Sequence, residues 1–298
     1  MDGCLRERFL LVDDFLPQER AVAMRADIDA HFDRPAEHKP DTHQVWNYWF
    51  VPGSYTYLRT TPEKVIGRER VEQFVNDLRE WAARNLGLAN VTWPYLSLYV
   101  PGCVQGLHND SVNGSLGFVY SLTRNDRRTL GGETLLMHER DLFRSSLNSA
   151  AAGTDLFDLV EPRFNRLTLF DDRIPHAVQR VDGPMDPREG RFVLHGHISE
   201  AGVTAQGTLP PDAIQNEIVG LLGQLRGMFA GQVHGPFVVS VEIGAGGQLT
   251  QMRPIVDRLA SANGADLELV RRAIAERLQA IRFPAADGPT RANIPLVF

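Results

Sequence analysis

The sequence predicts a mainly β protein with flanking helices, followed by a small α+β unit. Between residues 91 and 119, short apolar segments are separated by proline and glycine, a pattern typical of β-sandwiches and barrels. Two longer segments, residues 18–32 and 62–85, carry apolar side chains at helical spacing. After residue 202 the pattern changes to helix, strand, strand, helix and strand. The 298 residues suffice for one large or two ordinary domains.

The first elements flank the predicted β region. Residues 8–15 are expected to form a strand that ends before Pro17, and residues 18–32 a helix. The apolar positions of this helix are Val22, Met24, Ile28 and Phe32. The apolar stripe of the helix predicted at 62–85 is typical of a core contact, so we expect it to support one sheet.

Residues 33–61 separate these helices and are rich in proline, histidine and aromatic side chains. We expect a long loop beside the mouth of the barrel, which either covers a substrate or packs on the barrel exterior. Arg59 is a candidate substrate contact in this loop.

Three residues carry the pattern of a metal site. His108 and Asp110 are two positions apart, so on an extended segment their side chains face the same way. His176 would have to arrive from a segment much further along the chain. Two imidazoles and one carboxylate form the facial triad that suits non-haem Fe(II) and leaves positions open for other ligands. A His-x-Asp motif alone is weak, because such pairs are common in turns.

Further features strengthen this interpretation. The turn Gly131-Gly132-Glu133-Thr134 follows an apolar strand, and a second apolar strand, 167–170, leads into Pro175-His176. Arg191, in the segment GRFVLHGHI, is a charged residue on an otherwise apolar strand. Inside a barrel it needs an anionic partner, and a dicarboxylate would be one. Arg188 is the alternative residue for this role.

These segments together resemble the 2-oxoglutarate and Fe(II)-dependent dioxygenases, most closely their prolyl-hydroxylase branch. The matching motifs are Y-x-P-G-x-x-x-x-x-H-x-D from Tyr99 to Asp110, the GGET turn, L-F-D-D-R-x-P-H, the Arg191 strand and VDDFLPQE near the start. The resemblance covers roughly the first 200 residues. It implies a double-stranded β-helix, a relative of the jelly roll, for a domain at residues 1–202.

The resemblance also implies roles for individual residues. His108, Asp110 and His176 would hold Fe(II), and Arg191 would pair with the far carboxylate of the co-substrate 2-oxoglutarate. Tyr99, Tyr120 and Thr168 are further candidates for co-substrate contacts, although a buried tyrosine needs only some partner for its hydroxyl. Ser121 stands where relatives often carry a second tyrosine.

The activity that this family implies is hydroxylation of a C–H bond, with release of succinate and CO₂ and with ascorbate as a supporting reductant. The substrate would be a small molecule or a peptide, either a prolyl residue or another amino-acid-derived compound. Asp110 occupies the position that a halide would need, which favours hydroxylation over halogenation. Two other classes stay open: a metal-binding scaffold or interaction protein with a non-catalytic barrel, and a cupin-type oxidase that does not use 2-oxoglutarate.

The remaining histidines are expected to have no metal role. His195 and His197 also have i, i+2 spacing, but we interpret them as core or pocket-lining residues. The others lack a partner pattern and are expected at the surface or in structural roles: His31, His38, His43, His138 and His234. Residues 140–162 are more polar and are expected to form an insertion at the rim.

The C-terminal third is predicted as a linker and helix at 203–232 and a small α+β domain at 233–298. Its segments VSVEIGAGGQL, IRFPAADG and IPLVF resemble the C-terminal domain of TonB-like proteins. The membrane anchor and proline-rich spacer of that family are absent, so energy transduction is not implied. The expectation is a module that binds a protein partner or self-associates, since small sheets can add a strand from a partner.

Composition limits the partners. The net charge of −6 and a pI near 5.9 argue against a nucleic-acid partner, which would require a basic face. Two cysteines, Cys4 and Cys103, indicate no disulfide framework, and a reducing cytoplasm is the simplest compartment. We expect neither a secretory signal nor a membrane span.

Overall fold

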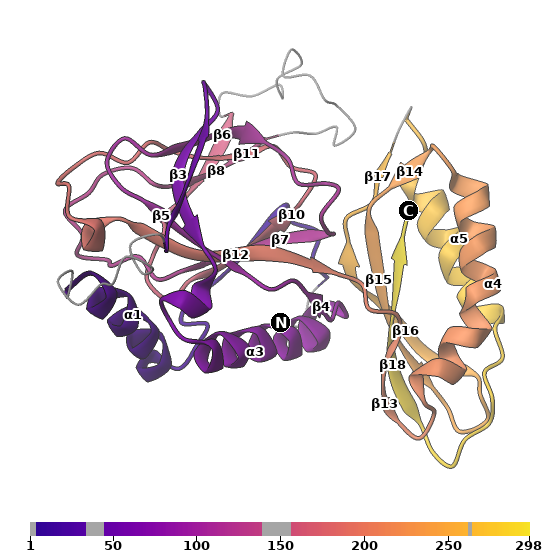
Figure 1. Ribbon diagram of the computed structural model, residues 1–298. Helices are drawn as coiled ribbons and strands as arrows, with labels where there is room; N and C mark the ends of the chain where they lie inside the picture. Colours follow the sequence, from indigo (N-terminus) through magenta and orange to yellow (C-terminus); the bar gives the residue numbers. More distant parts are fainter. Residues whose placement is uncertain (1–3, 34–44, 139–155, 262–263) are drawn as a thin grey trace.

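The computed structural model describes residues 4–33, 45–138, 156–261 and 264–298. Figure 1 shows two units side by side, a large β unit with two helices below it and a smaller sheet covered by two helices. The helices and strands of the first unit are β1 (Phe9–Val12), α1 (Gln18–Asp33), β2 (Asn47–Val51), β3 (Tyr55–Thr60), α3 (Arg68–Leu86), β4 (Asn90–Val91), β5 (Tyr95–Tyr99), β6 (Val104–His108), β7 (Leu116–Ser121), β8 (Thr134–Met137), β9 (Phe157–Val160), β10 (Leu167–Asp171), β11 (His176–Val178) and β12 (Arg191–Ser199).

The strands of the first unit form one curled antiparallel sheet of 12 strands, in the order β1-β10-β7-β12-β5-β3-β6-β11-β8-β9, with β2 and β4 off this path. The sheet contains two four-stranded arrays, β10-β7-β12-β5 and β6-β11-β8-β9. From β5 to β12 the chain alternates between these arrays from one strand to the next. The exception is the pair β8 and β9, which are consecutive and lie side by side in the second array. This connectivity is that of a double-stranded β-helix, so the predicted mainly β, jelly-roll fold with flanking helices is confirmed.

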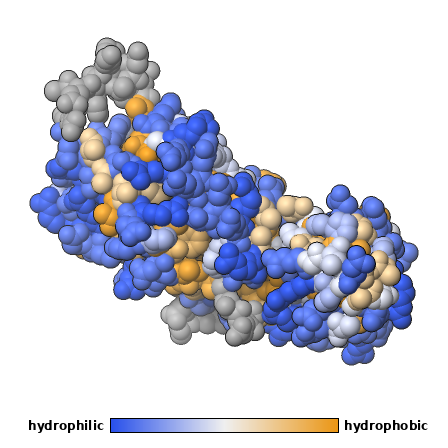
Figure 2. Space-filling view, turned by 90° about the horizontal axis from the view of Figure 1, so that it is seen from below, coloured by the Kyte–Doolittle hydropathy of each residue, from blue (hydrophilic) through white to orange (hydrophobic). Residues whose placement is uncertain are grey.

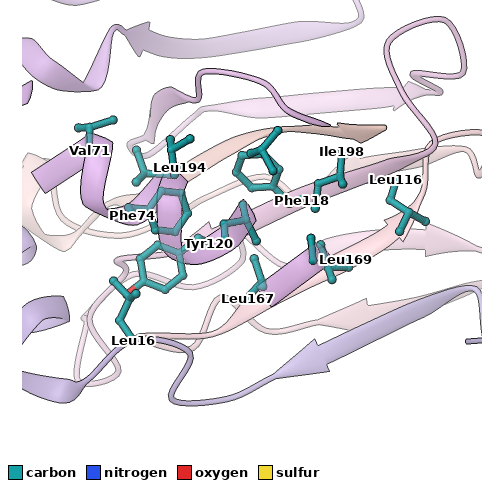
Figure 3. Close-up of a cluster of buried hydrophobic side chains, with 14 of the residues drawn as sticks. Leu16, Val71, Phe74, Leu116, Phe118, Tyr120, Leu167, Leu169, Leu194 and Ile198 are labelled. Atoms are coloured by element: carbon teal, nitrogen blue, oxygen red, sulfur yellow. The ribbon is translucent and has the colours of Figure 1, made fainter. Parts of the chain in front are cut away.

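The helices cover the outer face of the array β10-β7-β12-β5 (Figure 1). The buried stripe of α3 is Val71, Phe74, Val75, Leu78, Ala82 and Leu86. Figure 3 shows Phe74 beside Tyr120 of β7, with leucines of β10 nearby, and the two rings are 4.9 Å apart between centroids. The outward faces of the helices are polar, and the molecule seen from this side is mostly hydrophilic (Figure 2).

Several local predictions need correction. Val22 is 49% exposed, and α1 buries Ala21 and Arg25 in addition to Met24 and Ile28. The helix predicted at 62–85 is divided, because a short 3₁₀ turn at Pro62–Lys64 precedes Gly67, whose φ of 86° interrupts the helical conformation. The loop predicted at 33–61 instead contains the hairpin β2–β3, while residues 34–44 lie outside the described chain. Most of the predicted rim insertion, residues 140–155, also lies outside it.

The second unit contains β13 (Thr204–Gly207), α4 (Pro211–Phe229), β14 (Val233–His234), β15 (Pro236–Ile243), β16 (Leu249–Asp257), β17 (Ala260–Ser261), α5 (Leu267–Ala280) and β18 (Thr290–Val297). Its main sheet has the order β13-β18-β15-β16, and α4 and α5 cover one face around a hydrophobic core of their own. The stretch predicted as linker and helix, 203–232, therefore also contributes an edge strand, β13.

The other face of this sheet packs on the first unit. Val238, Ile255 and Val256 belong to the same hydrophobic cluster as α3. A Cβ at Gly87, the left-handed C-cap of α3, would collide with Val238, so the close approach requires glycine here. Of the helices that the structure describes, none is long and apolar enough to cross a membrane.

Candidate metal centre

His108, Asp110 and His176 meet at one end of the barrel. His108 ends β6 and His176 begins β11, and the two strands pair so that these residues lie directly opposite each other. Asp110 follows β6 by two residues, and its Oδ2 lies 3.5 Å from Nε2 of His176 and 4.0 Å from Nε2 of His108. One possible ligand atom from each of the three residues lies within 4.8 Å of the other two. The strand pairing thus brings together residues that are far apart in the sequence.

Backbone carbonyls orient both imidazoles. Nδ1 of His108 lies 2.8 Å from the carbonyl oxygen of Gly106, and Nδ1 of His176 lies 3.0 Å from that of Ile174. If each Nδ1 donates its proton there, each neutral ring presents an unprotonated Nε2 toward Asp110. This is the tautomer that a metal-binding histidine needs.

The charges of the cluster also suit a cation. Burial lowers the pKa of His108, and the neighbouring His176 lowers it further, which favours the neutral ring. Burial alone would raise the pKa of Asp110, but the neighbouring His176 and then His108 favour its carboxylate form and lower the pKa to about 2. A carboxylate and neutral imidazoles are the protonation states that bind metal.

Arg191 lies in the same cavity, whose volume is about 520 Å³. The side chain is buried, and its Nη2 donates to Oγ1 of Thr134 at 3.0 Å. Its Nε has no hydrogen-bond partner, and within the described chain no carboxylate forms an ion pair with it. Burial lowers the pKa of Arg191, yet guanidinium stays protonated at any ordinary pH. A buried cation without an anion is costly, so this position is suited to receive one from a ligand.

Tyr99 and Gln105 connect Arg191 to the histidines. The guanidinium carbon of Arg191 lies 4.8 Å from the centre of the Tyr99 ring. The Tyr99 hydroxyl donates to Oε1 of Gln105 at 2.8 Å, and Nε2 of Gln105 lies 3.3 Å from Nε2 of His108. Polar groups therefore line the cavity wall between the guanidinium and the metal-binding candidates. Gln105 was not singled out in the sequence, where a lone glutamine carries no signal.

The other predicted co-substrate residues, Thr168 and Tyr120, are not among the residues that line the cavity. Thr168 shares a face of β10 with Phe170, which lines the cavity, but Thr168 does not itself line it. Tyr120 also lies outside the cavity lining: its ring packs against α3, and its hydroxyl donates to Asn165 at 2.8 Å. Ser121 donates to the carbonyl oxygen of Pro162, also outside the cavity.

Arg188 does not take part in this site. It lies outside the cavity, where it forms ion pairs with Asp186 and Asp33. The choice of Arg191 over Arg188 as the cavity arginine is therefore consistent with the geometry.

A second group of possible ligands shares Asp110. Asp172 and His197 join it with donor atoms within 4.8 Å of one another, and Nδ1 of His197 lies 2.9 Å from Oδ2 of Asp172. His195 and His197, interpreted from the sequence as core or pocket-lining residues, both line the cavity. Asp172, the second aspartate of LFDDR, was missed as a neighbour of the site, although its place after a buried strand was visible in the sequence.

Comparisons with known proteins give structural likeness only. No protein-family model and no curated protein sequence matches the chain. Among solved structures, a Trichoplax adhaerens prolyl hydroxylase in complex with a peptide fragment of the hypoxia inducible factor oxygen degradation domain is 15% identical, with a TM-score of 0.45 over 64% of this chain and 82% of that one. A Pseudomonas putida prolyl-4-hydroxylase is 19% identical, with a TM-score of 0.45 over 65% and 94%. The non-haem α-ketoglutarate-dependent epimerase SnoN from nogalamycin biosynthesis is 13% identical, with a TM-score of 0.44 over 64% and 77%.

Proposed function

We propose that this protein is a 2-oxoglutarate- and Fe(II)-dependent dioxygenase that hydroxylates a C–H bond. The observation that carries the proposal is the convergence of His108, Asp110 and His176 in one cavity with Arg191, a buried cation that has no carboxylate partner in the described chain. Two nitrogens and one carboxylate oxygen fit a non-haem iron site, and the guanidinium fits a co-substrate with a second acidic group.

Each residue has a defined part in this proposal. His108, Asp110 and His176 would hold Fe(II), which with 2-oxoglutarate supplies the activation of O₂, one oxygen atom going to succinate as CO₂ leaves and the other to the substrate. Arg191 binds the far carboxylate of 2-oxoglutarate through charge-assisted hydrogen bonds, with Thr134 holding the guanidinium in place. Tyr99 and Gln105 would orient the co-substrate between the two.

The substrate is proposed as a prolyl residue or another amino-acid-derived compound, free or within a peptide. The open cavity mouth, with Trp49 and Tyr95 each more than one third exposed, leaves room for either. Ascorbate would serve as a supporting reductant.

Succinate release tests the proposal. Purified wild-type protein with Fe(II), 2-oxoglutarate and ascorbate should release succinate, and His108→Ala should abolish this release. His138→Ala is the matched control, because His138 lies outside the cavity beside Asp158 and should leave the rate unchanged. Absence of iron-dependent succinate release, also with prolyl peptides present, would favour a non-catalytic metal-binding scaffold.

We further propose a division into a dioxygenase domain at residues 1–202, a linker and helix at 203–232 and a TonB-C-like α+β domain at 233–298. The separate core of the second unit supports a division near residue 202. Its edge strand β13 could accept a strand from a protein partner or a second copy, whereas the edge of β16 is partly paired with Leu5. Light scattering on the full chain measures self-association.

We also propose a cytoplasmic location, since Cys4 and Cys103 are both free thiols.

A further inference from the structure

A second arginine, Arg59, faces the cavity of the metal centre at its mouth. It lies on β3, and its guanidinium carbon is 3.6 Å from the centre of the Trp49 ring and 4.0 Å from that of Tyr95. The guanidinium is therefore held between two aromatic rings. Stacking uses the two faces of the guanidinium plane, whereas its N–H groups point outward within that plane and stay available for hydrogen bonds.

Arg59 has no carboxylate partner in the part of the chain that the structure describes. The hydroxyl of Tyr57 is the hydrogen-bonding group beside it. Trp49 and Tyr95 are 39% and 44% exposed, so the stacked guanidinium lies where an incoming molecule would pass. The two aromatic rings hold the guanidinium of Arg59 in one orientation. This reduces the entropy cost of binding a ligand to it.

The register of the sheet separates Arg59 from Arg191. Arg59 is opposite Ser97 on β5, and Arg191 is opposite Tyr99 on the other side of the same strand. Two strand spacings and two residues along the strand place their Cα atoms roughly 12 Å apart. The two cations therefore occupy different parts of one cavity, and one small diacid bound at Arg191 and the metal centre leaves Arg59 accessible.

The charges of the cavity lining distinguish the two arginines further. Asp110 is the one carboxylate among the described residues that line the cavity. Burial and the charges of Arg59 and Arg191 lower the pKa of His195 to about 3, so His195 adds no charge. In the loaded site, Asp110 would pair with the metal ion, and the two carboxylates of the co-substrate would pair with the metal ion and Arg191. The positive charge of Arg59 would then have no negative partner in the cavity.

We infer that the primary substrate carries a free carboxylate, which Arg59 binds, and an apolar or ring portion that packs on Trp49 and Tyr95. That this ligand is the compound oxidised rests on the proposed function, whereas the existence of the carboxylate site does not. A substrate bound in this way presents its far end to His108 and His176 and is held at a fixed distance from them.

Isothermal titration with benzoate and benzamide tests the inference, because the two probes share a ring and differ in charge. The protein is loaded with Mn(II) and the 2-oxoglutarate analogue N-oxalylglycine, which occupies the site of Arg191. Wild type should bind benzoate at least about tenfold more tightly than benzamide, as expected for a charge-assisted contact. Arg59→Gln should lose this preference and bind benzamide as before.

Two further variants keep the test specific. Arg68→Gln is the matched control, since Arg68 also stacks near a cavity tryptophan, Trp93, but is exposed and paired with Glu72. It should keep the preference for benzoate. Arg59→Lys retains the positive charge but lacks the planar guanidinium, so it should keep a reduced preference for benzoate over benzamide. This variant separates loss of charge from loss of folding.

Equal binding of the two probes, no binding of benzoate, or a preference that survives in Arg59→Gln would each overturn the carboxylate site. Succinate release is measured separately on the same protein. Iron-dependent succinate release without a benzoate preference contradicts only the present inference. A benzoate preference without any succinate release contradicts only the proposed dioxygenase activity.

Discussion

Replacing Arg191 by glutamine should weaken binding of 2-oxoglutarate strongly without destabilising the ligand-free protein. The side chain is 2% exposed, its Nη2 donates to Oγ1 of Thr134, and its Nε has no hydrogen-bond partner. Removing one partner of a buried charge pair costs about 2–5 kcal/mol. At about 1.4 kcal/mol per factor of ten, the Kd for 2-oxoglutarate should rise roughly 30-fold to several thousand-fold.

Stability should respond in the opposite sense. In the ligand-free protein Arg191 is a buried cation without a carboxylate partner in the described chain, which is a cost and not a gain. A neutral glutamine keeps a donor for Thr134 and removes the buried charge. The free energy of unfolding of Arg191→Gln should therefore equal or exceed that of wild type. A merely structural arginine would show the reverse, a loss of stability.

Calorimetric titration of 2-oxoglutarate into Mn(II)-loaded protein measures the affinity, and urea denaturation of the ligand-free protein measures the stability. Arg188→Gln is the matched control, because Arg188 is of the same type, is close in sequence and lies outside the cavity in ion pairs with Asp186 and Asp33. An unchanged Kd in Arg191→Gln would refute the assignment and agree with an oxidase that does not use 2-oxoglutarate. Equal losses in both variants would also refute it.

Three further predictions concern the framework around the site. Asp171 is fully buried between Arg173 and Arg258, and although burial raises its pKa, these arginines bring the pKa below its usual 3.8. The carboxylate thus stabilises the fold above about pH 4, and Asp171→Asn should cost about 3–5 kcal/mol at neutral pH, a difference that shrinks as the pH falls below 4 in urea titrations. Gly131→Ala should cost about 2–4 kcal/mol, because a Cβ there meets the carbonyl oxygen of Arg180 at a φ of 78°. Gly53→Ala, at a similar φ of 74° with no atom nearby, should show only the smaller conformational cost of about 1–2 kcal/mol in thermal unfolding. Tyr120→Phe should lose about 1 kcal/mol with its hydrogen bond to Asn165 and leave the Kd for 2-oxoglutarate unchanged, whereas a weaker Kd would restore it as a co-substrate contact.

The sequence predicted those parts of the fold that depend on local periodicity. The apolar stripe of α3 and the apolar character of the strand that follows Arg191 in β12 are visible in the residues themselves, and so is the i, i+2 spacing of His108 and Asp110. The Gly131-Gly132 turn was also visible, and its two positive φ values of 78° and 81° explain why glycine stands there.

Other features depend on pairing between distant segments, which periodicity does not contain. The segment LGFVYS of β7 is apolar on both faces, so its sequence does not decide which face Tyr120 takes, and a shift of one residue reverses it. The aromatic residues of β2 and β3 carry no sign that β3 pairs with both β5 and β6. That pairing is what brings Arg59 into the cavity.

The contact between the two units was likewise not predictable. The turn between β10 and β11, which leads to His176, is held by Arg258 from the second unit, whose Nε donates to Asp171 at 3.0 Å. Arg173 of the same turn donates to the carbonyl oxygens of His234 and Arg258. These hydrogen bonds link residues that are far apart in the sequence, and they connect the C-terminal unit to the strand that carries a proposed metal ligand.

Metal binding measured by Mn(II) titration, followed by electron paramagnetic resonance, tests the central claim most directly. The facial arrangement of His108, Asp110 and His176 predicts one ion per chain in wild type and at least about 100-fold weaker binding in His176→Ala, with His138→Ala equal to wild type. Binding in His176→Ala as tight as in wild type would contradict the proposed metal centre.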